Sequence, residues 1–353
     1  MRLIHIVPQL PPALDGVGGY ALALARCLRD EAGIDSHFLV ADPAWKEEGA
    51  TEACFAARRL EAREAGSLQR ILEESAGQGT AVLLHYANYG YQRRGCPLWL
   101  ESGLRRWKVG LGRSARFITF FHEVYAGGPP WRSSFWLSPL QRRLSAHLAR
   151  LSDRSATSLD LYAGLLERIA PGTRALVLPV LSPLGEPADP PLLTARQPRR
   201  MVLFGGTGAR RLVLFERRDD LTAACRALAI EEILDIGPPL SDPPPGAIAG
   251  APVRCLGPLS DSAASACLLT AFAGFVAYRP AFFGKSTVFA AYCAHGLLPV
   301  CSGGGEAPRG LAWSPGAPAG PADLQAVAGA ARRWYLGHAA AGQAAVFREL
   351  LAA

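Results

Sequence analysis

The chain has 353 residues, of which 50% are hydrophobic and 19% are charged. This composition excludes an intrinsically disordered protein, which requires low hydrophobicity together with high net charge. A formal net charge of +7 favours an anionic partner, such as a phosphate, an anionic membrane surface or nucleic acid. The length predicts two domains, each large enough to bury its own core.

Lysine and cysteine usage add two constraints. Only Lys46, Lys108 and Lys285 among the 37 basic residues are lysines, and the 34 arginines reflect a compositional bias that carries little functional weight. None of the eight cysteines forms a CxxC pair and most lie in apolar runs, which predicts reduced, buried thiols in a soluble cytoplasmic protein. The N-terminus lacks the apolar stretch of a signal peptide, and the longest uncharged run, residues 262–278, is typical of a helix, a turn and a strand.

Short apolar runs alternate with longer amphipathic segments in the first half of the chain. The apolar runs resemble parallel strands buried on both faces, and they cover residues 3–7, 36–41, 81–85, 117–121 and 175–178. The helical segments between them fall near residues 19–31, 97–109, 138–151 and 158–169. This βαβ series predicts a doubly wound α/β domain.

A proline-rich stretch at residues 179–198 predicts an interdomain linker, after which the alternation restarts. The predicted strands are residues 201–204, 232–236, 253–256, 274–278 and 298–301. The predicted helices lie near residues 217–229, 260–270, 285–295, 321–335 and 339–352. The sequence therefore predicts two α/β domains with a cleft between them, formed by residues 1–180 with the C-terminal helix 336–353, and by residues 181–335.

The first segment that could bind a ligand follows the first predicted strand. Gly16, Gly18 and Gly19 open a helix there, and Tyr20 follows them. Glycines let backbone N–H groups approach a ligand, and a helix N-terminus favours an anion. The GxGG spacing is not the dinucleotide fingerprint GxGxxG. Phosphate or sugar binding and a tight strand–helix turn both fit this segment.

This opening resembles that of family 4-type glycosyltransferases with the GT-B fold. A strand is followed by P-x-L-P-P and by G-V-G-x-Y-A-x-x-L-A-R-x-L, over about 25 residues beginning at Pro8. The resemblance implies two Rossmann-like, doubly wound domains that face a central cleft, with C-terminal helices packing back toward the N-terminal domain. It also implies that the glycine loop lines the cleft near the donor phosphates and the acceptor.

The second segment is the end of the predicted strand 117–121, which His122 and Glu123 follow directly. Polar residues at the carboxyl end of a central strand lie where α/β folds bind ligands. A structural histidine is the alternative. The resembled enzymes often place a histidine after this strand beside the transferred sugar, which implies that role for His122 and makes Glu123 the candidate for a base.

Polar and aromatic residues also follow the predicted strand 81–85. His85, Tyr86, Asn88 and Tyr89 are expected to bind the acceptor, because aromatic rings stack on the apolar faces of sugars and amides bond to hydroxyl groups.

The third segment, residues 203–211, ends the first strand after the linker. Gly205 and Gly206 free the backbone there, while Arg210 and Arg211 supply cations with a fork geometry that suits phosphate. In the resembled family a basic residue after this strand contacts the donor diphosphate. Either arginine could take that part.

The fourth segment contains Gly284, Lys285, Ser286 and Thr287. It is not a Walker A motif, because Arg279 stands where that motif needs a glycine. A lysine at a helix start is favourable when a phosphate lies between it and the N–H groups of the first turn. We therefore expect these residues to bind the donor phosphates, with a solvated loop charge as the alternative for the lysine.

The fourth segment also lies without a gap over the donor-binding signature E-G-F-G-x-x-x-x-E-A-x-A-x-G of the resembled family. The two signature glutamates fall on Phe283 and Ala291, so the sugar and ribose contacts that they make in the family are not carried over. The next residues resemble the family's L-P-V-V-x-S-x-x-G-G-x-x-E loop, in which Glu306 is the acid that fits the pattern.

Together with these residues, the resemblance implies a metal-independent, retaining glycosyltransferase that moves a sugar from a nucleotide-diphosphate donor to a hydroxyl acceptor on a glycan, a lipid-linked saccharide or a small molecule. No metal or other cofactor is expected, because no DxD-like acidic pair stands in a strand-end loop. A nucleotide-sugar epimerase or hydrolase, and a binding protein without catalysis, remain the alternatives.

Two aromatic and basic segments, residues 105–108 and 131–136, could make peripheral contact with an anionic membrane. Packing of their rings and side-chain stems inside the fold is the alternative. Nucleic acid is not an expected partner, because no basic run is interleaved with aromatic residues.

Overall fold

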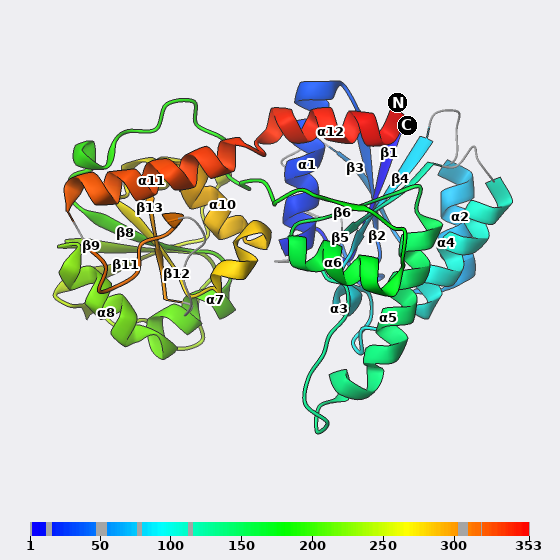
Figure 1. The fold of residues 1–353 in the computed structure, drawn as a ribbon, viewed down its shortest axis with the longest axis horizontal. Helices are drawn as coiled ribbons and strands as arrows, with labels where there is room; N and C mark the ends of the chain where they lie inside the picture. The colour runs from blue at the N-terminus through cyan, green and yellow to red at the C-terminus, as the bar shows by residue number, and fades with distance from the viewer. Residues whose placement is uncertain are drawn as a thin grey trace. The chain divides into compact units, whose positions relative to one another are not determined.

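Two parallel-stranded β-sheets, one in each of two units, form the core of the molecule (Figure 1). The computed structural model describes residues 2–11, 16–46, 55–75, 80–111, 116–302, 310–318 and 320–352. Unit 1 comprises Met1–Pro179 with Ala340–Ala353, and unit 2 comprises Val180–Ala339.

The sheet of unit 1 has seven strands in the order β3-β2-β1-β4-β5-β6-β7, all parallel to their neighbours. Its strands are β1 (Arg2–Val7), β2 (Asp35–Val40), β3 (Ala56–Arg59), β4 (Thr80–Tyr86), β5 (Arg116–Phe121), β6 (Arg154–Thr157) and β7 (Ala175–Val177). The chain builds outward from β1 in one direction and then returns to add β4 on its other side. The strand order therefore reverses between β1 and β4, which defines a topological switch point.

Helices cover both faces of this sheet. The helices of unit 1 are α1 (Gly16–Ala32), α2 (Ala65–Ser75), α3 (Asn88–Tyr91), α4 (Leu98–Leu111), α5 (Ser133–Leu151), α6 (Asp160–Ile169) and α12 (Ala340–Ala352). Apolar residues of α2, α4, α5 and α6 form one core cluster with β1, β4 and β5. Helix α1 packs on the opposite face and contacts α12.

The sheet of unit 2 has six strands in the order β10-β11-β9-β8-β12-β13. Its strands are β8 (Arg200–Phe204), β9 (Glu232–Ile236), β10 (Ala247–Ile248), β11 (Ala251–Gly257), β12 (Ala273–Val276) and β13 (Leu298–Cys301). Only the short edge strand β10 is antiparallel to its neighbour. The order reverses between β8 and β12, so unit 2 has a switch point of the same kind.

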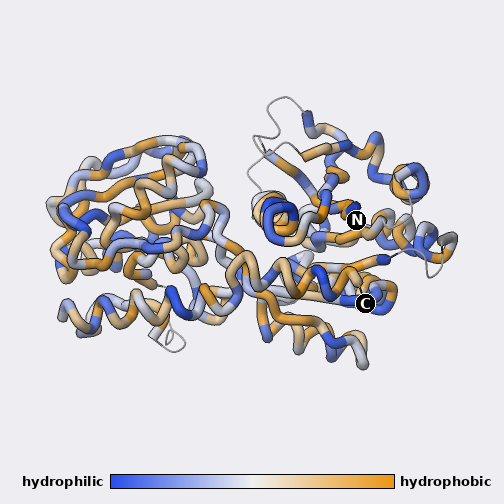
Figure 2. Tube along the Cα trace, turned by 90° about the horizontal axis from the view of Figure 1, so that it is seen from above, coloured by the Kyte–Doolittle hydropathy of each residue, from blue (hydrophilic) through white to orange (hydrophobic). Residues whose placement is uncertain are grey.

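Unit 2 carries helices and shorter helical turns around this sheet. They are η2 (Leu193–Ala195), α7 (Thr207–Arg211), the π-helical turn η3 (Leu212–Glu216), α8 (Arg218–Ala227), α9 (Asp261–Thr270), η4 (Pro280–Lys285), α10 (Thr287–Ala294) and α11 (Pro321–Leu336). In both units the central strands consist mostly of buried hydrophobic residues, because helices cover them from both sides. Hydrophobic segments run through both parts of the trace in Figure 2.

The predicted fold class, α/β with two Rossmann-like doubly wound sheets, is confirmed. Only part of the expectation for the C-terminal helices is right. Helix α12 packs on α1 of unit 1, whereas α11 contacts α10 and β13 within unit 2. The strands β3, β6 and β10 and the helices α2 and α3 have no predicted counterpart.

The proline-rich residues 180–198 are not a free linker, because they pack on unit 2. Arg196 is buried there and donates hydrogen bonds to the carbonyl oxygens of Leu268, Ala271 and His295, near the ends of α9 and α10. A cation beside helix C-termini is favoured by their partial negative charge. Burial lowers the pKa of Arg196 to about 10.

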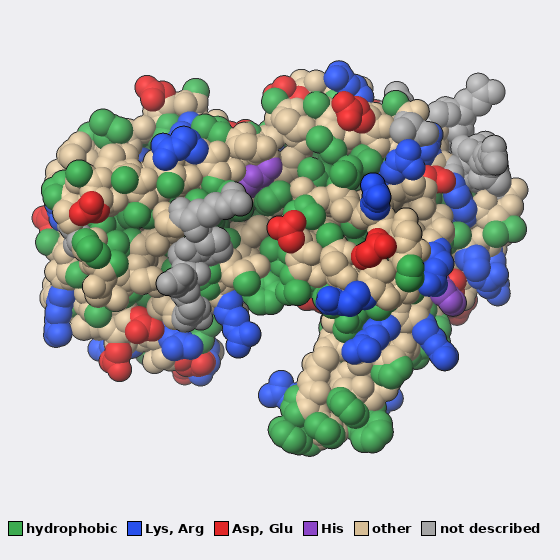
Figure 3. Space-filling view, viewed as in Figure 1, with side chains coloured by type: hydrophobic (Ala, Val, Ile, Leu, Met, Phe, Trp, Pro, Cys, Tyr) green, Lys and Arg blue, Asp and Glu red, His purple; other side chains and the backbone are tan. Residues whose placement is uncertain are grey.

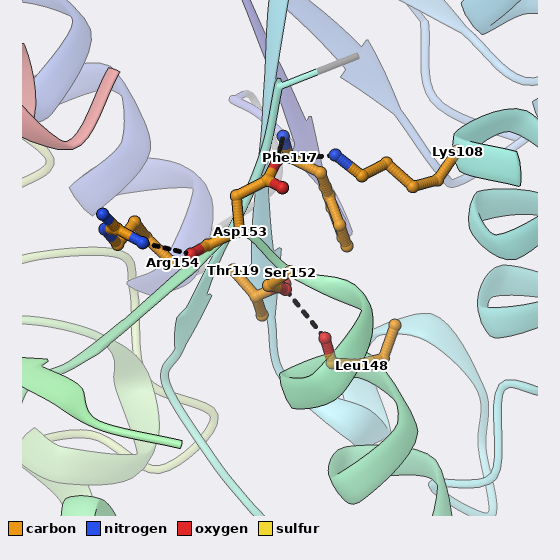
Figure 4. A network of polar contacts seen from close by, with 7 residues as sticks. All are labelled: Lys108, Phe117, Thr119, Leu148, Ser152, Asp153 and Arg154. Atoms are coloured by element: carbon orange, nitrogen blue, oxygen red, sulfur yellow. Dashed lines mark hydrogen bonds and ion pairs between the residues drawn. The ribbon is translucent and has the colours of Figure 1, made fainter. Parts of the chain in front are cut away.

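The segment 105–108, predicted to contact a membrane, lies partly inside unit 1. Trp107 is buried in the core. The ammonium group of Lys108 bonds at 2.6 Å to the carboxylate of Asp153, which also accepts from the backbone N–H of Phe117 at 2.7 Å (Figure 4). Trp107 and Lys108 therefore follow the buried alternative and tie α4 to the sheet, whereas Arg105 and Arg106 are exposed.

Candidate functional sites

A cavity of about 220 Å³ opens at the switch point of unit 2. It lies at the carboxyl ends of β8 and β12, where open α/β sheets bind ligands. Its lining includes Phe204, Arg210, Tyr278, Lys285, Ser286 and Thr287. None of the described residues that line it is acidic, so the cavity suits an anion better than a cation.

Lys285, Ser286 and Thr287 meet at one wall of this cavity, as the sequence predicts for a phosphate site. Lys285 ends η4 and Thr287 begins α10, so the lysine lies beside the N-terminus of that helix. The hydroxyl of Ser286 caps α10 by accepting from the N–H of Phe289 at 3.2 Å. The first turn of a helix presents N–H groups without intrahelical partners, which add to the positive character of the wall.

Arg210 borders the cavity, but its guanidinium is committed to a buried ion pair. Its Nε and Nη2 atoms donate to the two carboxylate oxygens of Asp235 at 2.6 and 2.5 Å, and Nη1 donates to the carbonyl of Pro238 at 2.6 Å. Both partners of the pair are buried. The residue predicted to contact the donor diphosphate is therefore a brace between α7 and the end of β9.

Arg211 is exposed and pairs with Glu216 at 2.7 Å, outside the cavity lining. Gly205 has a φ of +128°, a conformation that favours glycine, and its backbone carbonyl lies against Gly237 so closely that a Cβ there would clash. Gly206 caps the short helix α7. The backbone conformation thus explains Gly205, whereas Gly206 has open space around it, and Gly284 is buried in η4.

Phe283 and Ala291, which fall on the two signature glutamates of the resembled family, are buried in unit 2. The ring of Phe283 stacks on Phe289 with centroids 3.9 Å apart. An apolar stack thus fills the place where the signature would put a carboxylate. Glu306 lies outside the described residues.

Tyr292 is a further residue that holds the walls of this cavity together. The sequence does not single it out. Its hydroxyl donates to the carbonyl of Val202 and accepts from the N–H of Phe204, each at 3.1 Å. Gly274 on β12 makes room for the ring, because a Cβ at that position would lie 2.5 Å from it. These contacts hold the end of β8 against α10.

Three histidines form a hydrogen-bonded row across the sheet of unit 1. His5 on β1 bonds through Nδ1 to Nε2 of His85 on β4 at 3.0 Å, and Nδ1 of His85 bonds to Nε2 of His122 at 3.2 Å. At the other end, Nε2 of His5 lies 3.1 Å from the hydroxyl of Ser36 on β2. The register of the parallel strands places all four side chains on the face covered by α1.

The row works only if its rings are neutral and share one direction of hydrogen bonding. A neutral imidazole has one donor and one acceptor nitrogen, so the tautomer of His5 determines that of His85 and, through it, that of His122. Burial favours the neutral rings of His5 and His85, since it lowers the pKa of His5 to about 3 and that of His85 well below its ordinary value. The direction of the row therefore decides whether Nε2 of His122 donates to His85 or accepts from it.

Tyr20 closes this face of the strand ends. Its ring lies edge-on to His85 and His122, and its hydroxyl donates to Gln343 of α12 at 3.3 Å. Tyr20 is fully buried, so it supports the histidines and does not meet a ligand directly. In the same helix a Cβ at Gly18 would clash with the carbonyl of Gln9, whereas Gly16 and Gly19 have open space. Gly18 is thus explained by a tight strand–helix turn.

The four residues predicted to bind the acceptor are placed very differently. His85 belongs to the row, Tyr86 lies in the core cluster on the opposite face, and Asn88 is buried. Only Tyr89 is exposed, and its hydroxyl accepts from the amide of Gln141 at 3.3 Å. Tertiary packing covers the first three, so of the four only Tyr89 is exposed to a ligand at the surface of unit 1.

His122 and Glu123 do lie at the strand end, on the loop that follows β5. His122 is 8% exposed, and Glu123 is partly exposed. Gln141 of α5 accepts from the N–H of Ala126 at 2.8 Å and so holds this loop in place. Gln141 and His5 are the supporting residues that the sequence does not reveal. The signal for His5 was its alignment with His85 and His122 on one face of neighbouring strands, which appears only once the strand order is known.

Among the described residues, no three His, Cys, Asp or Glu side chains converge as a metal site. The same part of the chain contains no helix long and apolar enough to cross a membrane. Most of the described cysteines are buried, all are free thiols, and Cys255 is exposed.

No protein-family model and no curated protein matches the chain. Solved structures match it over nearly its full length. The E. coli structure of trehalose-6-phosphate bound with UDP-2-fluoro glucose superimposes with a TM-score of 0.62 at 11% identity and covers 99% of both chains. An α,α-trehalose-phosphate synthase (UDP-forming) from Burkholderia xenovorans gives 0.60 at 14% identity over 100% of both chains. A sucrose-phosphate synthase from Thermosynechococcus elongatus gives 0.59 at 15% identity, over 100% of this chain and 99% of that one.

The fold is that of GT-B glycosyltransferases. Identities this low show a shared fold and do not extend to a family or a reaction. Membership of family 4 stays a prediction.

Proposed function

We propose that the chain is a metal-independent, retaining glycosyltransferase that takes a nucleotide-diphosphate sugar on unit 2 and a hydroxyl acceptor on unit 1. The observation that carries this proposal is the 220 Å³ cavity at the switch point of unit 2, with Lys285 and the N-terminus of α10 in its wall and no acidic residue in its described lining. The fold shared with structures that bind UDP-2-fluoro glucose and glucose-6-phosphate supports it.

The cavity supplies what the leaving diphosphate requires. Cleavage of the bond to the sugar leaves negative charge on the diphosphate, and preorganised donors in a partly enclosed site stabilise that charge without a metal. Lys285 provides a full charge, and the first-turn N–H groups of α10 provide a partial one. Neither Arg210 nor Arg211 has a role in this proposal, because Arg210 pairs with the buried Asp235 and Arg211 pairs with the exposed Glu216.

On unit 1, His122 would face the transferred sugar and Glu123 would serve as a base if one is needed. The histidine row supports this assignment, because its hydrogen bonds hold the ring of His122 in position. The apolar pair Phe283 and Phe289 replaces a carboxylate in the donor region, so the sugar hydroxyls must be held by other groups than in the resembled signature.

The binding test compares the same change, lysine to glutamine, at two positions. Lys285→Gln removes the cation from the cavity, and Lys46→Gln removes an exposed cation from unit 1. A nucleoside diphosphate at 100 times its dissociation constant should stabilise the wild type by about 2.7 kcal/mol in thermal unfolding. We expect Lys285→Gln to weaken this ligand about 10- to 100-fold, as loss of a charge-assisted contact does, and Lys46→Gln to leave its affinity unchanged.

The proposal would be refuted if no nucleoside diphosphate and no nucleotide sugar in a panel stabilised the wild-type protein. Equal affinity in both variants would refute the assignment of Lys285. Turnover by the variant His122→Ala, measured at saturating donor, should fall more than its donor affinity does.

A nucleotide-sugar epimerase or hydrolase is the second candidate. A putative UDP-N-acetylglucosamine 2-epimerase from Listeria monocytogenes shares the fold with a TM-score of 0.53 at 13% identity, over 97% of this chain and 91% of that one. Conversion of the donor in the absence of any acceptor, followed by NMR of the sugar product, would favour this candidate. Tight binding without turnover under either condition would identify a non-catalytic binding protein.

A further inference from the structure

Three aromatic rings stand exposed at the N-terminal end of α5. Trp131 is 83% exposed, Trp136 71% and Phe135 42%, and we name these three residues the aromatic tip. The N-terminal end of α5 projects from unit 1 (Figure 1). In the space-filling view, hydrophobic side chains gather at the free end of this projection (Figure 3). Exposed aromatic clusters of this kind mark interaction sites.

The aromatic tip is held in shape by its own contacts. The indole N–H of Trp136 donates to the carbonyl of Pro130 at 2.8 Å, and its ring meets Phe135 edge-on at 5.3 Å. The backbone N–H of Arg132 donates to the carbonyl of Pro129 at 2.9 Å, which closes the turn that carries Trp131. The rings are thus presented outward by an ordered turn, so little conformational entropy is lost when they bind a partner.

The surroundings of the tip are basic. Residues 124–152 contain no Asp or Glu, while Arg132, Arg142 and Arg143 in this stretch are exposed. A second pair, Arg93 and Arg94, is exposed on the loop that α5 contacts through Gln141, whose amide donates to the carbonyl of Arg94 at 3.2 Å. We name Arg93, Arg94, Arg142 and Arg143 the arginine belt. None of the four takes part in an ion pair with another described residue.

The spacing of rings and charges matches the surface of a bilayer. Trp136 and Arg143 are seven residues apart, so they lie on one side of α5 with about 10 Å between them along the axis. Tryptophan prefers the boundary between headgroups and acyl chains, and basic residues prefer the anionic headgroups just outside it. A helix that enters with its tip first places both kinds of side chain at the depth that each prefers.

A second copy of the chain fits this surface less well. Symmetric pairing through the tip would bring the arginine belts of two copies together, and like charges repel. An anionic bilayer instead complements the belt and buries the rings.

We propose that unit 1 docks on anionic membranes through the aromatic tip, with the arginine belt on the lipid headgroups. This surface lies beyond the end of β5, on the loop and helix that follow His122, so docking turns the strand-end edge of unit 1 toward the lipid. The proposal does not depend on sugar transfer.

The test is flotation of the full-length protein with phosphatidylcholine vesicles and with vesicles that also contain phosphatidylglycerol. The wild type should bind the anionic vesicles and lose binding as salt is added. The variant W131A/W136A should partition at least tenfold more weakly. The variant R142Q/R143Q should lose on the order of tenfold at low salt and much less at high salt.

Matched controls separate the tip from general surface effects. V109A/L192A removes two exposed apolar side chains elsewhere, and R217Q/R218Q removes two exposed arginines of unit 2; both should bind like the wild type. The thermal midpoints of all four variants should stay near that of the wild type, because the altered side chains are exposed. Absence of wild-type binding, or equal binding by W131A/W136A, would overturn the proposal. A wild-type dimer that W131A/W136A converts to a monomer, with no vesicle binding, would instead show that the tip pairs two copies.

Discussion

Both units are doubly wound α/β folds with a switch point in the sheet, but the side chains at the two switch points differ. In unit 1 the strand ends are filled by Tyr20, His85 and His122, whose polar atoms bond to one another or to the protein. In unit 2 the equivalent edge carries a cavity of about 220 Å³ with Lys285 in its wall. The same architecture thus gives a neutral, packed edge in one unit and a cationic, open one in the other. Topology decides where a ligand could bind, and side-chain volume and charge decide whether there is room.

The largest expected effect tests whether Arg210 is a brace or a ligand contact. Arg210→Ala should lower the free energy of unfolding of unit 2 by about 3–5 kcal/mol, because it leaves the buried carboxylate of Asp235 unpaired. Urea unfolding without any ligand measures this directly. The neighbouring Arg211→Ala removes an exposed pair and should cost less than about 1 kcal/mol. Similar losses in the two variants would show that the buried pair is not the brace.

The next effect tests the neutrality of the histidine row. Unfolded His5 takes up a proton near its ordinary pKa of 6.5, whereas the folded ring does so only near pH 3. The unfolded state therefore binds more protons between these values, and stability should fall as the pH is lowered through this window, with no contribution from His5 above it. Acidification from pH 7 to pH 5 should cost about 2 kcal/mol through this ring alone.

The variant His5→Gln should remove this contribution and so flatten the dependence of the unfolding free energy on pH. His147→Gln, at an exposed histidine of α5, serves as the control and should keep the wild-type slope. A wild-type slope in His5→Gln as well would mean that His5 is protonated in the folded protein, and the directional row would then be wrong.

The smallest expected effect compares two neighbouring glycines at the start of α1. Gly18→Ala should destabilise unit 1 by about 1–2 kcal/mol, because its Cβ would meet the backbone carbonyl of Gln9. Gly19→Ala, one residue later in the same helix, meets no atom within 4 Å and should stabilise by up to about 1 kcal/mol. Thermal unfolding of both variants measures the difference. Equal effects would contradict the tight-turn explanation of Gly18.

Long apolar runs made most of the fold predictable, whereas short or polar strands and helices were not predicted from the sequence. The strand β6 is an example, since its residues 154–157 include two hydroxyl-bearing side chains that lower its apparent hydrophobicity. Thr157 is nevertheless buried, because its hydroxyl donates to the carbonyl of Phe121 at 2.8 Å. The start of α5 was predicted near residue 138, where Pro139 is typical of a first turn, yet the helix begins at Ser133 and carries the proline inside.

The residues of the candidate sites also fall into those that a local sequence pattern reveals and those that it does not. Lys285 and Ser286 could be singled out because a lone lysine before a helix start is a local pattern, and the cavity contains both. Arg210 could not be judged, because its partner Asp235 is distant in sequence and joins it only through the pairing of β8 with β9. For Trp131 and Trp107, the sequence shows two similar aromatic–basic segments, and burial alone separates the exposed ring from the core ring.

The sequence by itself determined that this protein has two doubly wound α/β units with strand-end loops, because hydrophobic periodicity and glycine placement are local properties of the chain. Only the tertiary structure decided where the polar residues at those loops lie and which side chains meet there. It paired Arg210 with Asp235, linked His5 to His85 and His122, and left Lys285 at the wall of a cavity. The physical reason is that a charged or polar side chain must find a partner when it is buried, and that partner comes from whichever strand the topology places beside it.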